Sequence, residues 1–289
     1  MNKICCLIPC LMLSNNREVN KKAMDTNYND LNLDKYIVCD QCFSQQDFDE
    51  RFEYIAHSDK PLGWAIARNK LLEWFYNSDY DYAFWIDANS TISKSCYNDV
   101  LSIFEYLRNN NSDIDAIFST LGIIVSNERI SCKKMSDHLE VVRLTPAKLD
   151  KTSLWMHGLI IKNFKKYNDE QLYIDERCDS RNHIPEDIYF SRLLRNLTNT
   201  YHAPTVIVNK PSAKTSTWMH DKGSYEYPYT DYETVDMYVN ENIKDKKFNL
   251  KKNATNSTIE IKRIDKYKDL VKPYTPRVRK KQTNIVSLF

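Results

Sequence analysis

Asp87 and Asn89 follow an apolar run and are the side chains in this sequence best placed for metal chemistry. The run Tyr82-Ala-Phe-Trp-Ile has the length and composition of a buried β-strand. Residues two apart in a strand project to the same side, so both side chains could offer oxygens to one hard cation, Mn²⁺ or Mg²⁺. A cation there would stabilise negative charge on a departing diphosphate. A simple turn, with Asn89 capping the next segment, is the alternative interpretation.

A second motif, Gly63-Trp-Ala-Ile-Ala-Arg68-Asn69, precedes this strand and opens an amphipathic helix. Together the two motifs resemble GT-A glycosyltransferases, including the inverting family of cellulose and chitin synthases and the Anp1-like mannosyltransferases. The resemblance implies that Arg68 lies near the diphosphate of a nucleotide sugar and that Asp87 contacts the ribose or the metal. Asn89 stands where that family usually has Asp, and an amide oxygen is a weaker metal ligand than a carboxylate. Taken alone, Arg68 would be an ordinary surface residue of a helix.

Pro9 and Asp40 lie at the ends of the first two predicted strands. Open α/β sheets bind ligands outside the carboxyl ends of their strands. By the same resemblance, Pro9 would pack against the nucleotide base and Asp40 would accept hydrogen bonds from the base or the ribose. On their own, the two residues indicate a strand terminator and a turn or helix cap.

Glu186 and Asp187 follow Pro185 at the start of a predicted helix. The pair resembles the Glu-Asp element that the family carries near the acceptor. An inverting transferase needs one carboxylate to deprotonate the acceptor hydroxyl, and we predict that Asp187 is this base, with Glu186 beside it. The alternative is a helix opening, because acidic residues in a first turn favour the helix dipole.

His220 and Lys222 lie after the last predicted strand, in Trp218-Met-His-Asp-Lys-Gly. Several GT-A enzymes complete the metal shell with a His from this region and close the site with a basic residue. By resemblance, His220 would be a metal ligand and Lys222 would meet the diphosphate. The segment Trp155-Met-His157-Gly158 resembles the acceptor-side loop of the family and equally suits core packing. A lone His is more often a satisfied structural residue.

Short apolar runs alternate with longer polar or amphipathic stretches, which is the pattern of βα units around a parallel sheet. The predicted fold class is α/β, a GT-A (Rossmann-like) fold with a mostly parallel central sheet flanked by helices and a smaller acceptor-side subregion. We expect a GT-A domain over 1–243, with a nucleotide-sugar half 1–125 and an acceptor half 126–243, and a basic extension over 244–289. The expected strands are Ile4–Leu11, Lys35–Cys39, Phe52–Ala56, Tyr82–Ile86, Ala116–Thr120, Val141–Leu144 and Thr205–Val208, and a short apolar segment lies at Leu159–Ile161. The expected helices are Trp64–Tyr76, Cys96–Arg108 and Ile188–Leu197.

Charge is unevenly distributed along the 289 residues, although the net charge is only +2. Residues 244–281 hold fourteen Lys or Arg against four Asp or Glu, which leaves the rest of the chain acidic. A basic tail either folds back on its own acidic body or contacts a polyanion, such as nucleic acid or a membrane surface.

The eight Cys show no paired metal-ligand spacing, and Cys5, Cys6 and Cys10 lie in an apolar run. This usage is typical of buried thiols in a reducing compartment, so we expect a cytoplasmic protein without disulfides. No apolar run reaches the roughly 20 residues of a transmembrane helix. The apolar segment Ile4 to Leu13 has the composition of a signal-peptide core, but we interpret it as a first buried strand, because no small-residue cleavage site follows it.

The leading functional hypothesis is transfer of a sugar from a nucleotide-diphosphate sugar, UDP-linked by preference, to a hydroxyl acceptor with the help of Mn²⁺ or Mg²⁺. Low Gly and abundant Asn, Lys and Tyr indicate an AT-rich genome. Together with the basic tail, this composition favours a phage enzyme that acts on hydroxymethylated pyrimidines in DNA, while protein and glycan acceptors remain alternatives. A non-catalytic nucleic-acid-binding module is the competing hypothesis from another class. A nucleotidyltransferase is disfavoured, because Leu11 to Arg17 contains no Gly-rich loop.

Overall fold

The computed structural model describes most of the chain up to residue 244. All described residues belong to one compact unit, Met1–Lys252. They are 1–11, 17–40, 52–58, 62–92, 97–119, 132–136, 139–144, 154, 156–168, 171–178, 184–203, 208–209 and 231–244.

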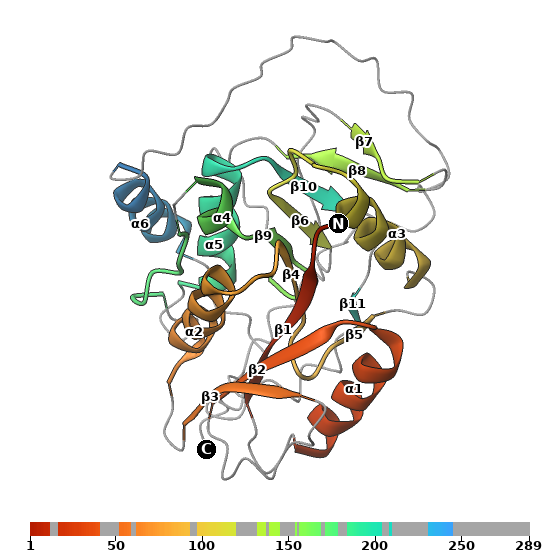
Figure 1. Ribbon diagram of the computed structural model, residues 1–289. Coiled ribbons are helices and arrows are strands. Elements are labelled where there is room, and N and C mark those ends of the chain that lie inside the picture. Colours follow the sequence, from red (N-terminus) through yellow and green to blue (C-terminus); the bar gives the residue numbers. More distant parts are fainter. Residues whose placement is uncertain are drawn as a thin grey trace, which may run out of the picture. The chain divides into compact units, whose positions relative to one another are not determined.

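Within these residues, nine strands form one sheet in the order β3-β2-β1-β4-β9-β6-β10-β8-β7. The first four in that order run parallel, as does the pair β6 and β10 (Figure 1). Strand β9 lies between β4 and β6 and runs antiparallel to both. The antiparallel strands β8 and β7 complete the far edge. The strands are β1 Ile4–Leu11, β2 Asp34–Asp40, β3 Glu53–Ser58, β4 Tyr82–Trp85, β6 Ala116–Ser119, β7 Cys132–Lys134, β8 Glu140–Arg143, β9 Ile160–Lys162 and β10 Thr200–Ala203.

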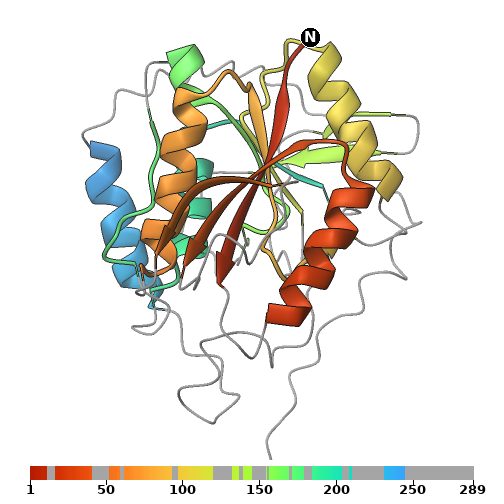
Figure 2. The ribbon, with the colours of Figure 1, turned by 60° about the horizontal axis from the view of Figure 1, so that its bottom comes forward.

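Helices cover both faces of the sheet (Figure 2). One hydrophobic cluster joins the sheet to α1 (Arg17–Asp30) and α3 (Tyr97–Asn109). The other joins it to α2 (Trp64–Asn77), α4 (Phe164–Asn168), α5 (Glu186–Leu197) and α6 (Tyr232–Lys244). Strands with an apolar layer on each side must be hydrophobic throughout, which is why β1 and β4 are continuous apolar runs.

Helical periodicity explains which face each helix buries. In α3 the buried residues are Val100, Ile103, Phe104 and Leu107, which recur at the spacing of one helix face. In α2, Leu71, Leu72 and Phe75 are fully buried. Each such side chain contributes about 1.5–3 kcal/mol relative to an exposed one. The burial holds α2 rigidly against β1 and β2, and this fixes the direction in which its first turn points.

The predicted fold class, an α/β protein with a mostly parallel central sheet flanked by helices, is confirmed. Strand β1 has the predicted bounds, and α2, α3 and α5 agree with prediction to within two residues at each end. The strand predicted at Thr205–Val208 lies outside the described residues except for Val208, which belongs to β11. The strand β10, Thr200–Ala203, follows α5 directly and was not predicted. A separate pair, β5 (Thr91–Ile92) and β11 (Val208–Asn209), forms a small second sheet.

The cysteines agree with prediction only in part. Cys5, Cys6, Cys10 and Cys178 are free and buried, and burial raises the pKa of the Cys6 thiol to about 12. Cys39, however, is disulfide-bonded, so the prediction of no disulfides was wrong at this position. Among the described helices, none has the length and apolar character that crossing a membrane requires.

Candidate active site

The centre of the candidate site is a turn at the carboxyl end of β4. The strand ends at Trp85, and the Ser90 N–H donates to the Asp87 carbonyl at 2.9 Å, which closes a turn over residues 87–90. Asp87 and Asn89 therefore lie in a turn and not in a strand. The expectation that their side chains project to the same side, as residues two apart in a strand do, does not apply to them. Asn89 is half-buried, and its Oδ1 accepts from the Ser90 hydroxyl at 3.4 Å. Its role as a metal ligand stays a prediction.

Asp87 is buried and points towards the face of the sheet that carries α2 and α5. Its Oδ1 lies 3.6 Å from Arg68 Nη2. Pro9 is adjacent, because its carbonyl accepts from the Ala88 N–H at 3.2 Å. The structure therefore brings Arg68, Asp87 and Pro9 together, as the motifs predicted.

Arg68 projects from the second turn of α2 and is only 4% exposed. Its Nη1 lies 3.1 Å from Glu186 Oε1 and donates to the Met156 sulfur at 3.6 Å. The indole of Trp64, one turn earlier, lies 5.5 Å from the guanidinium carbon. Gly63 is the N-cap residue of α2, and its φ of +84° is a conformation that glycine adopts without strain.

Glu186 and Asp187 form the first turn of α5, as predicted, but they differ in exposure. Glu186 is 5% exposed and pairs with Arg68, whereas Asp187 is half-buried and its Oδ1 accepts from the Ile188 N–H at 3.0 Å. Burial acts to lower the pKa of Arg68, but the negative charges of Glu186, Asp87 and Asp187 outweigh it and leave that pKa raised. Arg68 is therefore a buried cation that pairs with Asp87 and Glu186 and also interacts electrostatically with Asp187.

His157 also reaches this cluster, through the antiparallel strand β9. The Gly158 N–H donates to the Trp85 carbonyl, and the Trp85 N–H donates to the Leu159 carbonyl. This pairing brings His157 beside Asp87, with 3.8 Å between Nδ1 and Oδ2. The ring is 2% exposed. Its segment was recognised in the sequence, but the contact with Asp87 depends on the antiparallel register, which one sequence does not reveal.

Asn69, next to Arg68 in the motif, has a structural role that the sequence did not reveal. Its amide donates to the Ile174 carbonyl and accepts from the Ile174 N–H, both at 2.8 Å. This two-point contact ties residues 171–178 to α2. The same segment is tied to α6, since Arg177 pairs with Glu241 at 2.8 Å. The two neighbours in the motif thus face different partners.

Three predicted site residues are described incompletely or lie outside the described residues. Asp40 is the last residue of β2, and its backbone pairs with Leu11 at the carboxyl edge of the sheet, but its side chain is outside the described part. His220 and Lys222 lie wholly outside it. Their proposed contacts with metal and diphosphate stay predictions.

Among the described side chains, no group of three or more His, Cys, Asp or Glu could by itself hold a metal ion. In nucleotide sites, Mg²⁺ is usually held by one or two carboxylates together with phosphate oxygens and water. The buried carboxylate of Asp87 suits that mode of binding. It also lies in a cluster where Arg68 faces three carboxylates, so that a divalent cation would reduce the excess negative charge.

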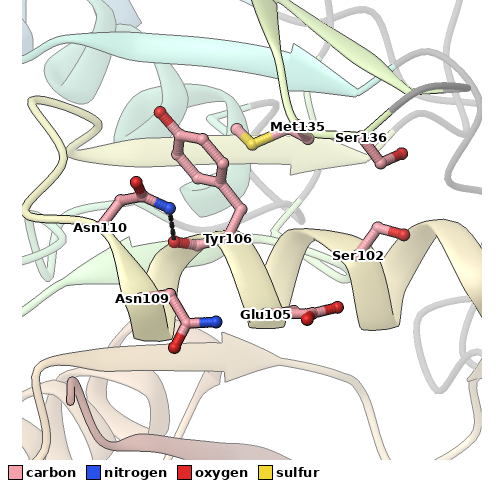
Figure 3. Close-up of a pocket in the computed structure, with 7 residues that line it drawn as sticks. All are labelled: Ser102, Glu105, Tyr106, Asn109, Asn110, Met135 and Ser136. Carbon is pink, nitrogen blue, oxygen red and sulfur yellow. Dashed lines mark hydrogen bonds between the residues drawn. The ribbon is translucent and has the colours of Figure 1, made fainter.

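A cavity of about 300 Å³ lies elsewhere, between the second half of α3 and the residues after β7 (Figure 3). Glu105, Tyr106 and Met135 are among its lining residues. The Asn2 N–H donates to the Arg108 carbonyl, which places this end of α3 beside the amino end of β1. The cavity is therefore at the opposite edge of the sheet from Asp87.

Comparison with known proteins gives similarity in structure but not in sequence. No family model matches the chain, and no curated protein sequence matches it. Among solved structures, TarS 1-349 from S. aureus in complex with UDP-GlcNAc is 14% identical, with a TM-score of 0.49, over 85% of this chain and 67% of that chain. TarS 1-349 with UDP is 15% identical, with a TM-score of 0.42, over 70% and 60%. A197 from STIV is 14% identical, with a TM-score of 0.38, over 72% and 85%. At these scores the likeness does not assign an activity or a substrate to this chain.

Proposed function

We propose that this protein is a GT-A glycosyltransferase that transfers a sugar from a UDP-sugar to a hydroxyl acceptor with the help of a divalent metal. One observation carries the proposal. Arg68, Asp87 and Glu186 were singled out by their motifs, and the Arg68 guanidinium lies 3.6 Å from Asp87 and 3.1 Å from Glu186 at the carboxyl edge of a mostly parallel sheet. Ligands bind at this edge in open α/β sheets.

In the proposed reaction, the oxygen of the acceptor hydroxyl bonds to the anomeric carbon of the sugar. The hydroxyl proton passes to the Asp187 carboxylate. The bond between the anomeric carbon and the diphosphate oxygen breaks, and its electron pair leaves with the diphosphate. This assignment of the base implies inversion at the anomeric carbon. Asp187 is only half-buried, whereas Glu186 is buried. This difference supports Asp187 as the base, because a base must reach the substrate.

The donor would be bound by residues around Asp87. Pro9 would pack against the base, Asp40 would accept from the base or ribose, and Lys222 would meet the diphosphate. A bound Mn²⁺ or Mg²⁺, held by Asp87 with Asn89 and His220, would supply positive charge where the diphosphate departs. The adjacency of Pro9 to the turn of Asp87 supports this arrangement.

Melting temperatures test the donor proposal directly. A ligand that binds the folded state stabilises it by about 2.7 kcal/mol at a hundred times its Kd. We expect UDP with Mn²⁺ to raise the melting temperature, and GDP, CDP or Mn²⁺ alone to raise it less. Equal melting temperatures with and without every nucleotide would reject a nucleotide-sugar enzyme.

For the acceptor, we propose hydroxymethylated pyrimidine in DNA, bound with the help of the basic segment 244–281. The fourteen basic residues of this segment support the proposal. Changing Arg277, Arg279, Lys280 and Lys281 to Gln should weaken DNA binding. The slope of the logarithm of the binding constant against the logarithm of the salt concentration should also become shallower, by nearly one unit per lost phosphate contact. UDP binding serves as the control and should not change. Unaltered DNA affinity and salt slope would favour a protein or glycan acceptor.

A further inference from the structure

We propose that Arg68 is a positioning residue, which holds Asp87 and Glu186 in place, and that it does not contact the diphosphate. The inference rests on the proposed function and assigns a different role to one residue of that site. By resemblance alone, Arg68 would have been a diphosphate ligand.

The burial of Arg68 is the first argument. A diphosphate ligand must present N–H groups to the substrate, whereas this side chain is 4% exposed. Its Nη1 meets Glu186 at 3.1 Å and the Met156 sulfur at 3.6 Å, and its Nη2 meets Asp87 at 3.6 Å. Trp64 lies against the guanidinium. Both Nη atoms are thus directed at protein groups.

Charge gives the second argument. The positive charge of Arg68 faces three carboxylates, those of Asp87, Glu186 and Asp187. This group is negative as a whole, so it offers no net attraction to a diphosphate. The positive charge that a diphosphate needs must come from elsewhere, and the metal and Lys222 are the proposed sources.

The position of Arg68 in the fold gives the third argument. Arg68 belongs to α2, Asp87 to the turn after β4, and Glu186 to the first turn of α5. One guanidinium therefore links three elements that are distant in sequence. Because Asp187 follows Glu186 in the same helical turn, fixing Glu186 also fixes the backbone that carries the proposed base. In Arg68→Lys, the lysine keeps a positive charge beside Asp87 but cannot bridge Asp87 and Glu186 at once. This substitution should therefore disturb turnover more than donor binding.

The experiment compares Arg68→Lys, Glu186→Gln and the double variant, with Lys70→Gln on the same helix as control. UDP affinity is measured by calorimetry with Mn²⁺. Turnover is measured as UDP release from UDP-sugar, with water as acceptor. We expect each single variant to lower turnover about tenfold or more, with KM and UDP affinity within about threefold of wild type. Since the two residues act as a unit, the double variant should be no worse than the more severe single one.

Two results would separate the possible failures. If wild-type protein neither binds UDP nor releases it from the donor, the proposed function fails and this inference fails with it. If wild type binds UDP, and Arg68→Lys loses that affinity while Glu186→Gln keeps it, then Arg68 is a diphosphate ligand and only this inference fails. If Arg68→Lys does not fold, Arg68→Gln with Glu186→Gln replaces the buried ion pair by two neutral amides, which can still hydrogen-bond to each other and to Asp87. That variant should bind UDP with low turnover, and loss of UDP binding would count against the inference.

Discussion

Asp87→Asn should abolish metal-dependent donor binding and lower sugar transfer by about 10²–10³-fold or more, the usual cost of removing one electrostatic contact to the developing charge. The amide has nearly the size of the carboxylate, and Arg68 keeps its contact with Glu186 at 3.1 Å, so the variant should fold. The measurement is the rise in melting temperature that UDP and Mn²⁺ produce together, followed by the rate of transfer.

Asp79→Asn is the matched control for Asp87→Asn, because it makes the same substitution at an exposed carboxylate just after α2. It should leave both the melting shift and the rate unchanged. An Asp87→Asn protein with the full Mn²⁺-dependent shift would show that this carboxylate does not hold the metal, and the proposed metal site would have to be abandoned.

Asp187→Asn should lower turnover by about 10²–10⁴-fold, the usual contribution of a general base, while UDP affinity stays near that of wild type. The expected separation follows from the different places of the two carboxylates. Asp87 lies at the end of β4 beside Pro9, where the donor would bind, and Asp187 lies in the first turn of α5. Steady-state kinetics with varied donor, together with UDP calorimetry, separate turnover from affinity.

The control for Asp187 is Glu233→Gln in the first turn of α6. Both substitutions remove a negative charge near a helix N-terminus, which costs about 0.3–1 kcal/mol of stability. If Asp187 only favours the helix dipole, the two variants should lose similar stability and neither should lose turnover. Normal transfer by Asp187→Asn would thus reject it as the base.

The elements that the sequence predicted well have a strong local signal. Helix α2 places Leu71, Leu72 and Phe75 at helical spacing, and β1 is an uninterrupted apolar run. Helix α6 was missed because only Val235 and Val239 are buried along its length, so its periodicity is weak. Strand β10 was missed because Thr200 and His202 are polar and yet buried by the sheet.

The site could be predicted as a set of residues but not as a set of contacts. The motifs around Arg68, Asp87 and Glu186 were each visible, because each combines an unusual polar group with a strand end or a helix start. The partners of Arg68 were not visible, since Glu186 lies 118 residues further along the chain. The contact of His157 with Asp87 depends on antiparallel pairing between β4 and β9. Long-range register is the information that a single sequence lacks.

The position of β9 has a consequence for how this protein is made. A ribosome releases β1 to β4 and β6 before residues 160–162, yet β9 is the strand that pairs with both β4 and β6. The nascent chain therefore carries unpaired strand edges on β4 and β6 until β9 emerges, and such edges invite pairing with other chains. Synthesis that stalls between β6 and β9 should accordingly yield aggregation-prone fragments that depend on chaperones.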